Sequence, residues 1–177
     1  VGLKPSYGRV SRYGLIAMTS SLDQAGPICR SVEDAAIVLE AISGSDGRDA
    51  TAADKPVENY LSALALPLKG LKAGLPKEYF SGGMSAEVEK AITVAVKKLE
   101  DLGTEIIEVS LPHTVYALAV YYIIMPAEVS SNLARYDGVR YGHHSAVAKD
   151  LYEVSALSRS EGFGAEVKRR IMMGTYA

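Results

Sequence analysis

The densest cluster of cationic side chains in this 177-residue sequence is Lys168-Arg169-Arg170. Three consecutive residues on a helix spread over most of one turn, so the three cations cannot all face one ligand. A guanidinium pairs with a carboxylate through two parallel N–H donors, which a single ammonium group cannot match. An arginine that turns inward here would suit an amino-acid substrate, whereas composition alone favours a charged helix surface.

Histidine, cysteine and serine are not arranged for metal binding or nucleophilic catalysis. His143 and His144 are adjacent, so their side chains point in different directions, and no third ligand stands at zinc-binding spacing. The single cysteine, Cys29, excludes an internal disulfide and has no histidine near it in the sequence. No serine occupies a Gly-x-Ser-x-Gly elbow. We therefore predict no metal site, and a surface loop around the two histidines.

Charge and hydropathy limit the classes of partner. With 19 basic and 21 acidic residues the net charge is −2, which provides no global positive field for a nucleic-acid backbone. The longest apolar run, residues 115–126, is about half of the ~20 residues that span a bilayer. The first residues show neither an initiator methionine nor a signal-peptide pattern. We expect no membrane association, a cytoplasmic location, and a start internal to a larger polypeptide.

Capping residues and periodicity predict the elements of the first third. Residues 1–27 predict loops and short strands that need partners elsewhere. Ser31 precedes an acidic first turn, which predicts a helix that ends at Gly44. Residues 45–67 have weak periodicity and predict a surface connection with one helical turn over residues 60–64.

The middle of the sequence predicts a strand, a helix and a second strand. Residues 71–75 are a short strand candidate, and Ser85 begins a helix with one apolar stripe that ends at Gly103. Residues 104–109 alternate as a strand. This order is that of a βαβ unit, with a right-handed crossover if both strands join one parallel sheet. The chain is therefore assigned to the α/β class.

The C-terminal part predicts mainly helix. Beyond residue 112 we expect two helical stretches separated at Met125-Pro126, since proline removes an amide donor and disfavours helix at the preceding residue. Such a break would aim Tyr121, Tyr122 and Glu128 at a cleft.

A polar loop is expected next, over residues 137–144. A last helix is predicted from Glu161 or Gly164 into Ile171. Gly162 and Gly164 lack the Lys-Ser/Thr pair of a phosphate-binding loop, so they indicate a turn before that helix.

Several long stretches resemble one known family. Residues 1–17 (VGLKPSYGRVSRYGLIA) and 20–27 (SSLDQAGP) are similar to the final part of the amidase-signature region. Residues 126–142 (PAEVSSNLARYDGVRYG) resemble the glutaminase subunit of tRNA-dependent amidotransferases, a stretch that general amidases lack. Three further segments continue the match, so the resemblance covers essentially the whole chain: residues 158–164, 166–171 and 174–177.

The resemblance implies an amidase-signature fold, with a mixed central sheet flanked by helices. Residues 1–177 would form a single partial amidase domain. Within it, residues 1–45 would end the amidase-signature core, and residues 46–70 would be a surface connection. Residues 71–177 would hold the strand-helix-strand unit and the helices that follow.

The family is implied to use a Ser, cis-Ser, Lys triad, in which lysine acts through the middle serine to activate the nucleophile. All three residues, and the backbone amides of the oxyanion hole, are expected upstream of Val1. The resemblance therefore implies no catalytic residue in this chain, and the fragment alone is predicted to be inactive.

The resemblance also implies residues of the glutamine pocket. Arg170, in the Lys-Arg-Arg-Ile motif, is expected to bind the α-carboxylate of the substrate, and Tyr121 is expected near the pocket mouth. Two alternatives remain open. Arg170 would instead pair with Glu166 one turn earlier, and Tyr121 would be an ordinary core aromatic.

In its full-length form, such a protein hydrolyses glutamine to supply ammonia for the ATP-dependent conversion of Glu-tRNA(Gln) to Gln-tRNA(Gln), a carbon–nitrogen ligase reaction. The resemblance implies amidotransferase subunits B and C as partners, with Glu-tRNA(Gln) bound through the complex. ATP and Mg are expected at the partner subunit, and no cofactor in this chain. The alternatives are a fragment of a free-standing small-amide amidase, or an inactive scaffold piece whose exposed apolar edges promote association.

Overall fold

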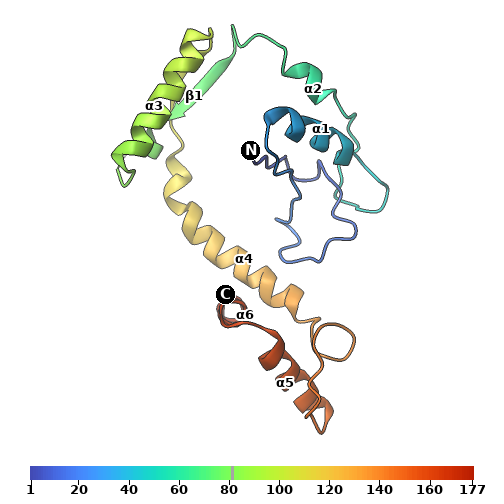
Figure 1. Ribbon diagram of the computed structural model, residues 1–177. Coiled ribbons are helices and arrows are strands. Elements are labelled where there is room, and N and C mark those ends of the chain that lie inside the picture. The colour runs from blue at the N-terminus through green and yellow to red at the C-terminus, as the bar shows by residue number, and fades with distance from the viewer. Residues whose placement is uncertain (81) are drawn as a thin grey trace. The chain divides into compact units, whose positions relative to one another are not determined.

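The computed structural model describes residues 1–80 and 82–177, which divide into two compact units. The first unit comprises residues 1–60 and 118–177, and the second comprises residues 61–117. Figure 1 shows the helices and strands along the chain. The prediction of one partial amidase domain, with its inner boundaries, stays a prediction. Within the part of the chain that the structure describes, no helix is long and apolar enough to cross a membrane.

Helix α1 (Val32–Ile42) begins and ends where its capping residues require. The Ser31 hydroxyl accepts a hydrogen bond from the Asp34 amide at 3.0 Å, which satisfies one of the free amides of the first turn. After the helix, Gly44 has a φ of 104°, a value that residues with a side chain rarely adopt. The predicted helix and its end at Gly44 are confirmed.

The segment before α1 is mostly loop. Gly2 forms an isolated antiparallel bridge with Ile28, and Val10 forms another with Ser43. Val10 is buried, so this second bridge brings an apolar side chain against the end of α1. The predicted loops are confirmed, whereas the predicted short strands were wrong, since residues 1–27 of the described structure form only these isolated bridges.

The connection predicted over residues 45–67 contains one short helix, α2 (Tyr60–Ala63), as expected. The Tyr60 hydroxyl accepts a hydrogen bond from Arg9 Nε at 2.6 Å, and its amide donates to the Glu40 carboxylate at 3.1 Å. Both of these hydrogen bonds lie within the first unit.

The second unit is built on two short parallel strands, β1 (Lys72–Pro76) and β2 (Glu105–Val109). Helix α3 (Ala86–Asp101) lies between them in sequence, and the Ser85 hydroxyl caps it. Gly103, with a φ of 93°, turns the chain from α3 into β2. The predicted strand-helix-strand unit, its parallel pairing and the α/β class are confirmed.

Two short 3-10 helices follow the strands: η1 (Lys77–Phe80) after β1 and η2 (Pro112–Tyr116) after β2. The Glu78 carboxylate accepts hydrogen bonds from the Ser110 hydroxyl and from the Leu111 amide. These bonds lower the pKa of Glu78, the Leu111 amide contributing most, and they tie the end of β2 to η1.

Helix α4 (Ala117–Leu133) runs through Pro126 without interruption. The prediction of two stretches separated at Met125-Pro126 was therefore wrong, and so was the break that would aim side chains at a cleft. A proline inside a helix costs about 3 kcal/mol. Met125, Pro126 and Val129 are all buried, and burial of a large apolar side chain stabilises by about 1.5–3 kcal/mol. Tertiary burial thus outweighs the lost hydrogen bond.

Two helices follow the polar loop of residues 137–144, where one was predicted: α5 (Leu151–Gly162) and α6 (Ala165–Tyr176). The start of α6 after Gly164 is confirmed, and the alternative start at Glu161 was wrong because Glu161 belongs to α5. The predicted helix also continues beyond Ile171.

Helix α5 was not predicted. Its N-terminus is a reciprocal cap in which the Asp150 carboxylate accepts from the Glu153 amide at 2.8 Å. The Glu153 carboxylate in turn accepts from the Lys149 amide at 2.8 Å. The Asp-x-x-Glu spacing was the signal in the sequence that could have located this helix.

Helix α6 approaches α4 so closely that Gly174 lies against the backbone of α4. A Cβ atom at position 174 would collide with the carbonyl oxygen of Pro126. Beside this contact the hydroxyls of Ser130 and Thr175 are 3.0 Å apart, within hydrogen-bond distance. Only glycine permits this distance between the two helices.

Replacement of Gly174 by alanine should destabilise the protein. The added methyl group would force the helices apart, an overpacking cost of about 1–3 kcal/mol, against a gain in helix propensity of about 1 kcal/mol. We expect Gly174→Ala to lower the free energy of unfolding, measured by urea denaturation and circular dichroism. The matched control is Gly2→Ala, whose Cβ would meet nothing within 4 Å. Equal stability of the two variants would contradict the close approach.

Candidate functional site

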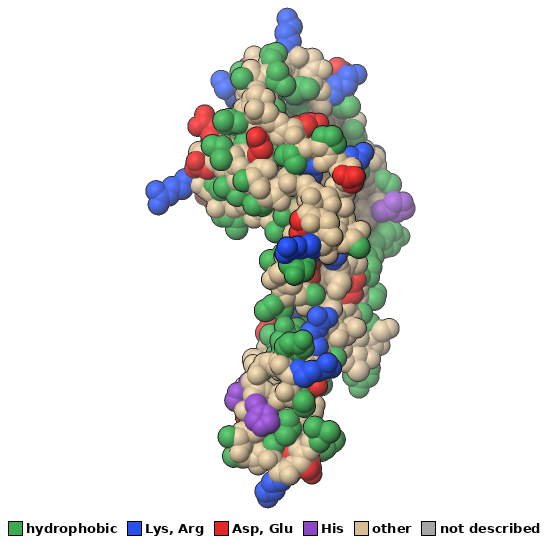
Figure 2. Space-filling view, turned by 90° about the vertical axis from the view of Figure 1, so that its right-hand side faces the viewer, with side chains coloured by type: hydrophobic (Ala, Val, Ile, Leu, Met, Phe, Trp, Pro, Cys, Tyr) green, Lys and Arg blue, Asp and Glu red, His purple; other side chains and the backbone are tan. Residues whose placement is uncertain are grey.

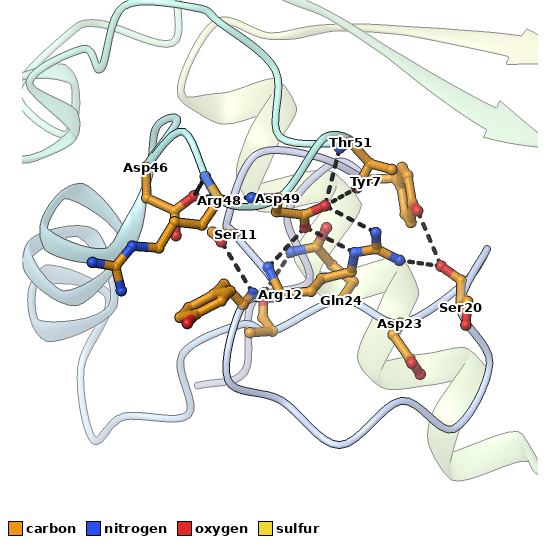
Figure 3. A network of polar contacts seen from close by, with 12 residues as sticks. Tyr7, Ser11, Arg12, Ser20, Asp23, Gln24, Asp46, Arg48, Asp49 and Thr51 are labelled. Atoms are coloured by element: carbon orange, nitrogen blue, oxygen red, sulfur yellow. Dashed lines mark hydrogen bonds and ion pairs between the residues drawn. The ribbon is translucent and has the colours of Figure 1, made fainter. Parts of the chain in front are cut away.

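A bidentate arginine–carboxylate pair holds the N-terminal loops together (Figure 3). Arg12 Nε and Nη2 donate to the two oxygens of Asp49, both at 2.9 Å, and the Arg12 amide donates to the same carboxylate at 2.9 Å. The amide and hydroxyl of Thr51 donate to it at 3.0 and 2.8 Å. Arg12 also donates to the Ser20 carbonyl.

These contacts hold the pKa of Asp49 well below its usual range, with the Arg12 hydrogen bond as the largest cause. In return, the hydrogen bond to Asp49 raises the pKa of Arg12. Because five N–H and O–H groups of the chain already point at the Asp49 carboxylate, this pair serves as a structural clamp. Its two members are 37 positions apart in the sequence, so the periodicity gave no signal for the pair.

Helix α4 holds the loop of residues 18–23 through two polar side chains. The Glu128 carboxylate accepts hydrogen bonds from the Ser21 amide, at 2.9 Å, and from the Ser21 hydroxyl. One turn later, Asn132 accepts from the Ser20 hydroxyl and donates to the Met18 carbonyl, both at 3.1 Å. Glu128, which was expected to face a cleft, therefore binds this loop.

Arg170 and Tyr121, the two predicted substrate-binding residues, contact each other. Arg170 Nη1, on α6, donates to the Tyr121 hydroxyl oxygen on α4 at 3.1 Å. Nη1 also lies 3.9 Å from the sulfur of Met125. The hydrogen bond to Tyr121 is the largest cause that raises the pKa of Arg170. The structure thus brings together two residues that are 49 positions apart, while their roles stay predictions.

The two alternatives for these residues have different outcomes. Arg170 Nε donates to Glu166 Oε1 at 2.9 Å, so the pairing one turn earlier is present together with the Tyr121 contact. Tyr121 has an exposed fraction of 41% in this 177-residue chain, and its role as a core aromatic stays a prediction.

A second arginine, Arg169, also donates hydrogen bonds to Glu166. Arg169 donates from Nε and Nη2 to the two oxygens of Glu166, both at 2.8 Å. This hydrogen-bonded pair is the largest cause that lowers the pKa of Glu166 to about 2. Lys168 turns instead to the Ser160 carbonyl at 3.0 Å. The prediction that the three cations do not share one direction is confirmed.

The two adjacent histidines bind different partners. His143 Nε2 lies 2.7 Å from the Glu161 carboxylate, and His144 Nδ1 lies 2.7 Å from the Gly138 carbonyl oxygen. The His143 contact is the largest cause that lowers the pKa of Glu161, and the Ser145 hydroxyl adds to it. Among residues 1–80 and 82–177, no group of three or more His, Cys, Asp or Glu side chains could hold a metal ion.

The surface charges are mixed. On the face drawn in Figure 2, basic side chains are interspersed with acidic and apolar ones rather than gathered into one large patch. This distribution agrees with the net charge of −2 and provides no extended basic surface on that face.

Removal of Arg169 should raise the pKa of Glu166 from about 2 toward its ordinary value of 4.5. Because the folded-state pKa is depressed, the contribution of ionised Glu166 to stability is complete above about pH 4.5. It is lost as the pH falls from there through about 2.

We expect Arg169→Gln to shift the pKa of Glu166 more than Arg170→Gln, since Arg169 donates two hydrogen bonds to it and Arg170 donates one. NMR titration of the glutamate carboxyl carbons measures both shifts. A larger shift in Arg170→Gln would refute the assignment of Arg169 as the main partner.

The sequence has clear relatives. The amidase family model matches residues 1–177. The chain is 63% identical over 177 residues to the A-subunit of glutamyl-tRNA(Gln) amidotransferase from Carboxydothermus hydrogenoformans. It covers 36% of that protein, and so spans about a third of the length of the curated relatives it matches.

Solved structures give the same result. The A-subunit of the Thermotoga maritima glutamyl-tRNA(Gln) amidotransferase matches with a TM-score of 0.70 and 40% identity, over 98% of this chain and 32% of that one. The peptide amidase of Stenotrophomonas maltophilia matches with a TM-score of 0.66 and 29% identity, over 96% of this chain and 35% of that one. With a family model matched along its whole length, and with its fold found in these enzymes, the chain belongs to the amidase family.

Proposed function

We propose that this chain is a segment of the glutaminase subunit of a tRNA-dependent amidotransferase. In this proposal the complete protein hydrolyses glutamine and supplies ammonia for the conversion of Glu-tRNA(Gln) to Gln-tRNA(Gln). The observation that carries the proposal is the 63% identity over all 177 residues to a glutamyl-tRNA(Gln) amidotransferase protein. The Ser, cis-Ser, Lys triad would lie outside this segment, which contributes a wall of the glutamine pocket.

The Arg170–Tyr121 pair is proposed as the part of that wall that binds the α-carboxylate of glutamine. Its support is chemical: a guanidinium and a phenol hydroxyl meet at 3.1 Å, and both are natural donors to a carboxylate. The exposed fraction of 41% at Tyr121 leaves the pair accessible to a ligand in this structure.

The remaining chemistry is assigned to partner subunits. Subunits B and C would complete a cytoplasmic heterotrimer, with ATP and Mg bound at the partner that activates Glu-tRNA(Gln). The net charge of −2 supports this division, because a phosphate backbone is held mainly by clusters of Lys and Arg.

A free-standing amidase on small amides is the second candidate. The match to a peptide amidase at 29% identity favours it, since that fold region is shared by both kinds of enzyme. The two candidates differ in one measurable property, which is whether amide hydrolysis depends on partner subunits.

Ammonia release from glutamine should require the complete enzyme. We expect no release by the 177-residue chain alone, and release by a full-length enzyme that carries this sequence, mixed with subunits B and C. Activity that is indifferent to the partners, with small amides preferred to glutamine, would favour the second candidate. Activity in the 177-residue chain itself would place the nucleophile within these residues and contradict the proposal.

Removal of the Arg170 guanidinium should weaken glutamine binding. A hydrogen bond to a charged group contributes about 1.5–3 kcal/mol, so we expect Arg170→Ala in the full-length enzyme to raise the KM for glutamine roughly tenfold to a hundredfold. Steady-state kinetics of ammonia release measures this change. Lys168→Ala serves as the control, since Lys168 belongs to the same basic cluster but donates to the Ser160 carbonyl instead of to Glu166 or Tyr121. An unchanged KM in Arg170→Ala would remove the carboxylate-binding role.

A further inference from the structure

The guanidinium of Arg170 is hydrogen-bonded through Nε and Nη1. Nε donates to Glu166 Oε1 at 2.9 Å, and Nη1 donates to the Tyr121 hydroxyl at 3.1 Å. Within residues 1–80 and 82–177, Nη2 makes no hydrogen bond. Nη1 also contacts the Met125 sulfur at 3.9 Å, so of the five N–H donors of the guanidinium the terminal Nη1/Nη2 edge keeps the two on Nη2 for a ligand.

Tyr121 also keeps a donor. Its oxygen accepts the hydrogen bond from Arg170, so its own hydroxyl proton does not point at the guanidinium. No other group in the described part of the chain accepts this proton. The hydroxyl proton and the terminal edge of Arg170 are therefore two donor sets in contact with each other, and a carboxylate has two oxygens to match them.

The charges around Glu166 leave one positive charge uncompensated. Glu166 is a single carboxylate that pairs with two guanidinium groups, those of Arg169 and Arg170. Arg169 takes both carboxylate oxygens, while Arg170 shares only Oε1. Glu166 can therefore orient Arg170 without neutralising the cluster, which stays attractive to an anion.

We propose that Glu166 is a positioning residue that fixes Arg170 by its Nε edge, so that the terminal edge and the Tyr121 hydroxyl receive the substrate α-carboxylate end-on. This inference rests on the proposed function, in which Arg170 binds glutamine. Glu166 does not touch the substrate. It restricts the rotation of the guanidinium, which without Glu166 would be held only through Nη1.

The test is a double-mutant cycle between Glu166 and Arg170 in the full-length enzyme with its partner subunits. We expect Glu166→Ala to raise the KM for glutamine about tenfold with kcat little changed, since it removes an interaction that orders a binding group. In the Arg170→Ala background, Glu166→Ala should add no further increase. Glu166→Gln retains an oxygen acceptor for Nε and should keep a KM closer to that of the unchanged enzyme.

Two controls separate positioning from a structural effect on the helix. Glu153 occupies the first turn of α5 as Glu166 does in α6, so Glu153→Ala also removes a first-turn carboxylate. Its KM for glutamine should not change. A glutamine analogue with an α-carboxamide in place of the α-carboxylate should be used equally well by the unchanged enzyme and by Glu166→Ala, because it offers no carboxylate to the positioned edge.

The outcomes distinguish the carboxylate site from the positioning role of Glu166. If Arg170→Ala leaves the KM unchanged, the carboxylate site itself fails, and the positioning role fails with it. If Arg170→Ala raises the KM while Glu166→Ala does not, only the positioning role is overturned. The same holds if Glu166→Ala has an equal effect with and without Arg170, since a structural defect would be additive and a positioning defect would not.

Discussion

The candidate site depends on the contact between the backbones of α4 and α6 at Pro126 and Gly174. Gly174 lies one turn beyond Arg170 on α6, and Pro126 lies just over one turn beyond Tyr121 on α4. The close approach therefore fixes the distance between the helices beside the pair that makes the 3.1 Å hydrogen bond. A larger separation at the crossing would move the guanidinium out of reach of the hydroxyl.

Helix α4 performs two tasks with one stripe of side chains. Tyr121, Met125, Glu128 and Asn132 follow the i, i+4, i+7, i+11 spacing of a single helix face. Near its N-terminal end this stripe meets α6 through Tyr121, and near its C-terminal end it holds the loop of residues 18–23. The continuity of α4 through Pro126 keeps these contacts in register, so the burial that overcomes the proline also connects the N-terminal loops to the candidate site.

Local elements and the parallel pairing of β1 with β2 were predictable from the sequence, whereas the long-range side-chain contacts were not. The caps at Ser31 and Ser85 depend on residues within one turn, so periodicity and residue type located α1 and α3. The continuity at Pro126 depends on burial by distant segments, which a local rule about proline cannot include. The Arg12–Asp49 clamp joins positions 37 residues apart and left no periodic signal. Arg170 and Tyr121 were singled out by resemblance to a family, and only the structure shows that they meet.

The ion pair of Arg170 with Glu166 and the proposed binding role of Arg170 do not exclude each other. A lysine at this position would carry its charge on a single nitrogen, and that nitrogen would face Glu166 when the two residues pair. The guanidinium separates the two tasks in space: Nε faces Glu166 within the same helix, while the terminal Nη1 faces α4. The i, i+4 ion pair then restricts the side chain before any ligand arrives, which reduces the entropy that binding must remove. For this reason the pairing of Arg170 with Glu166 is compatible with the proposed binding role.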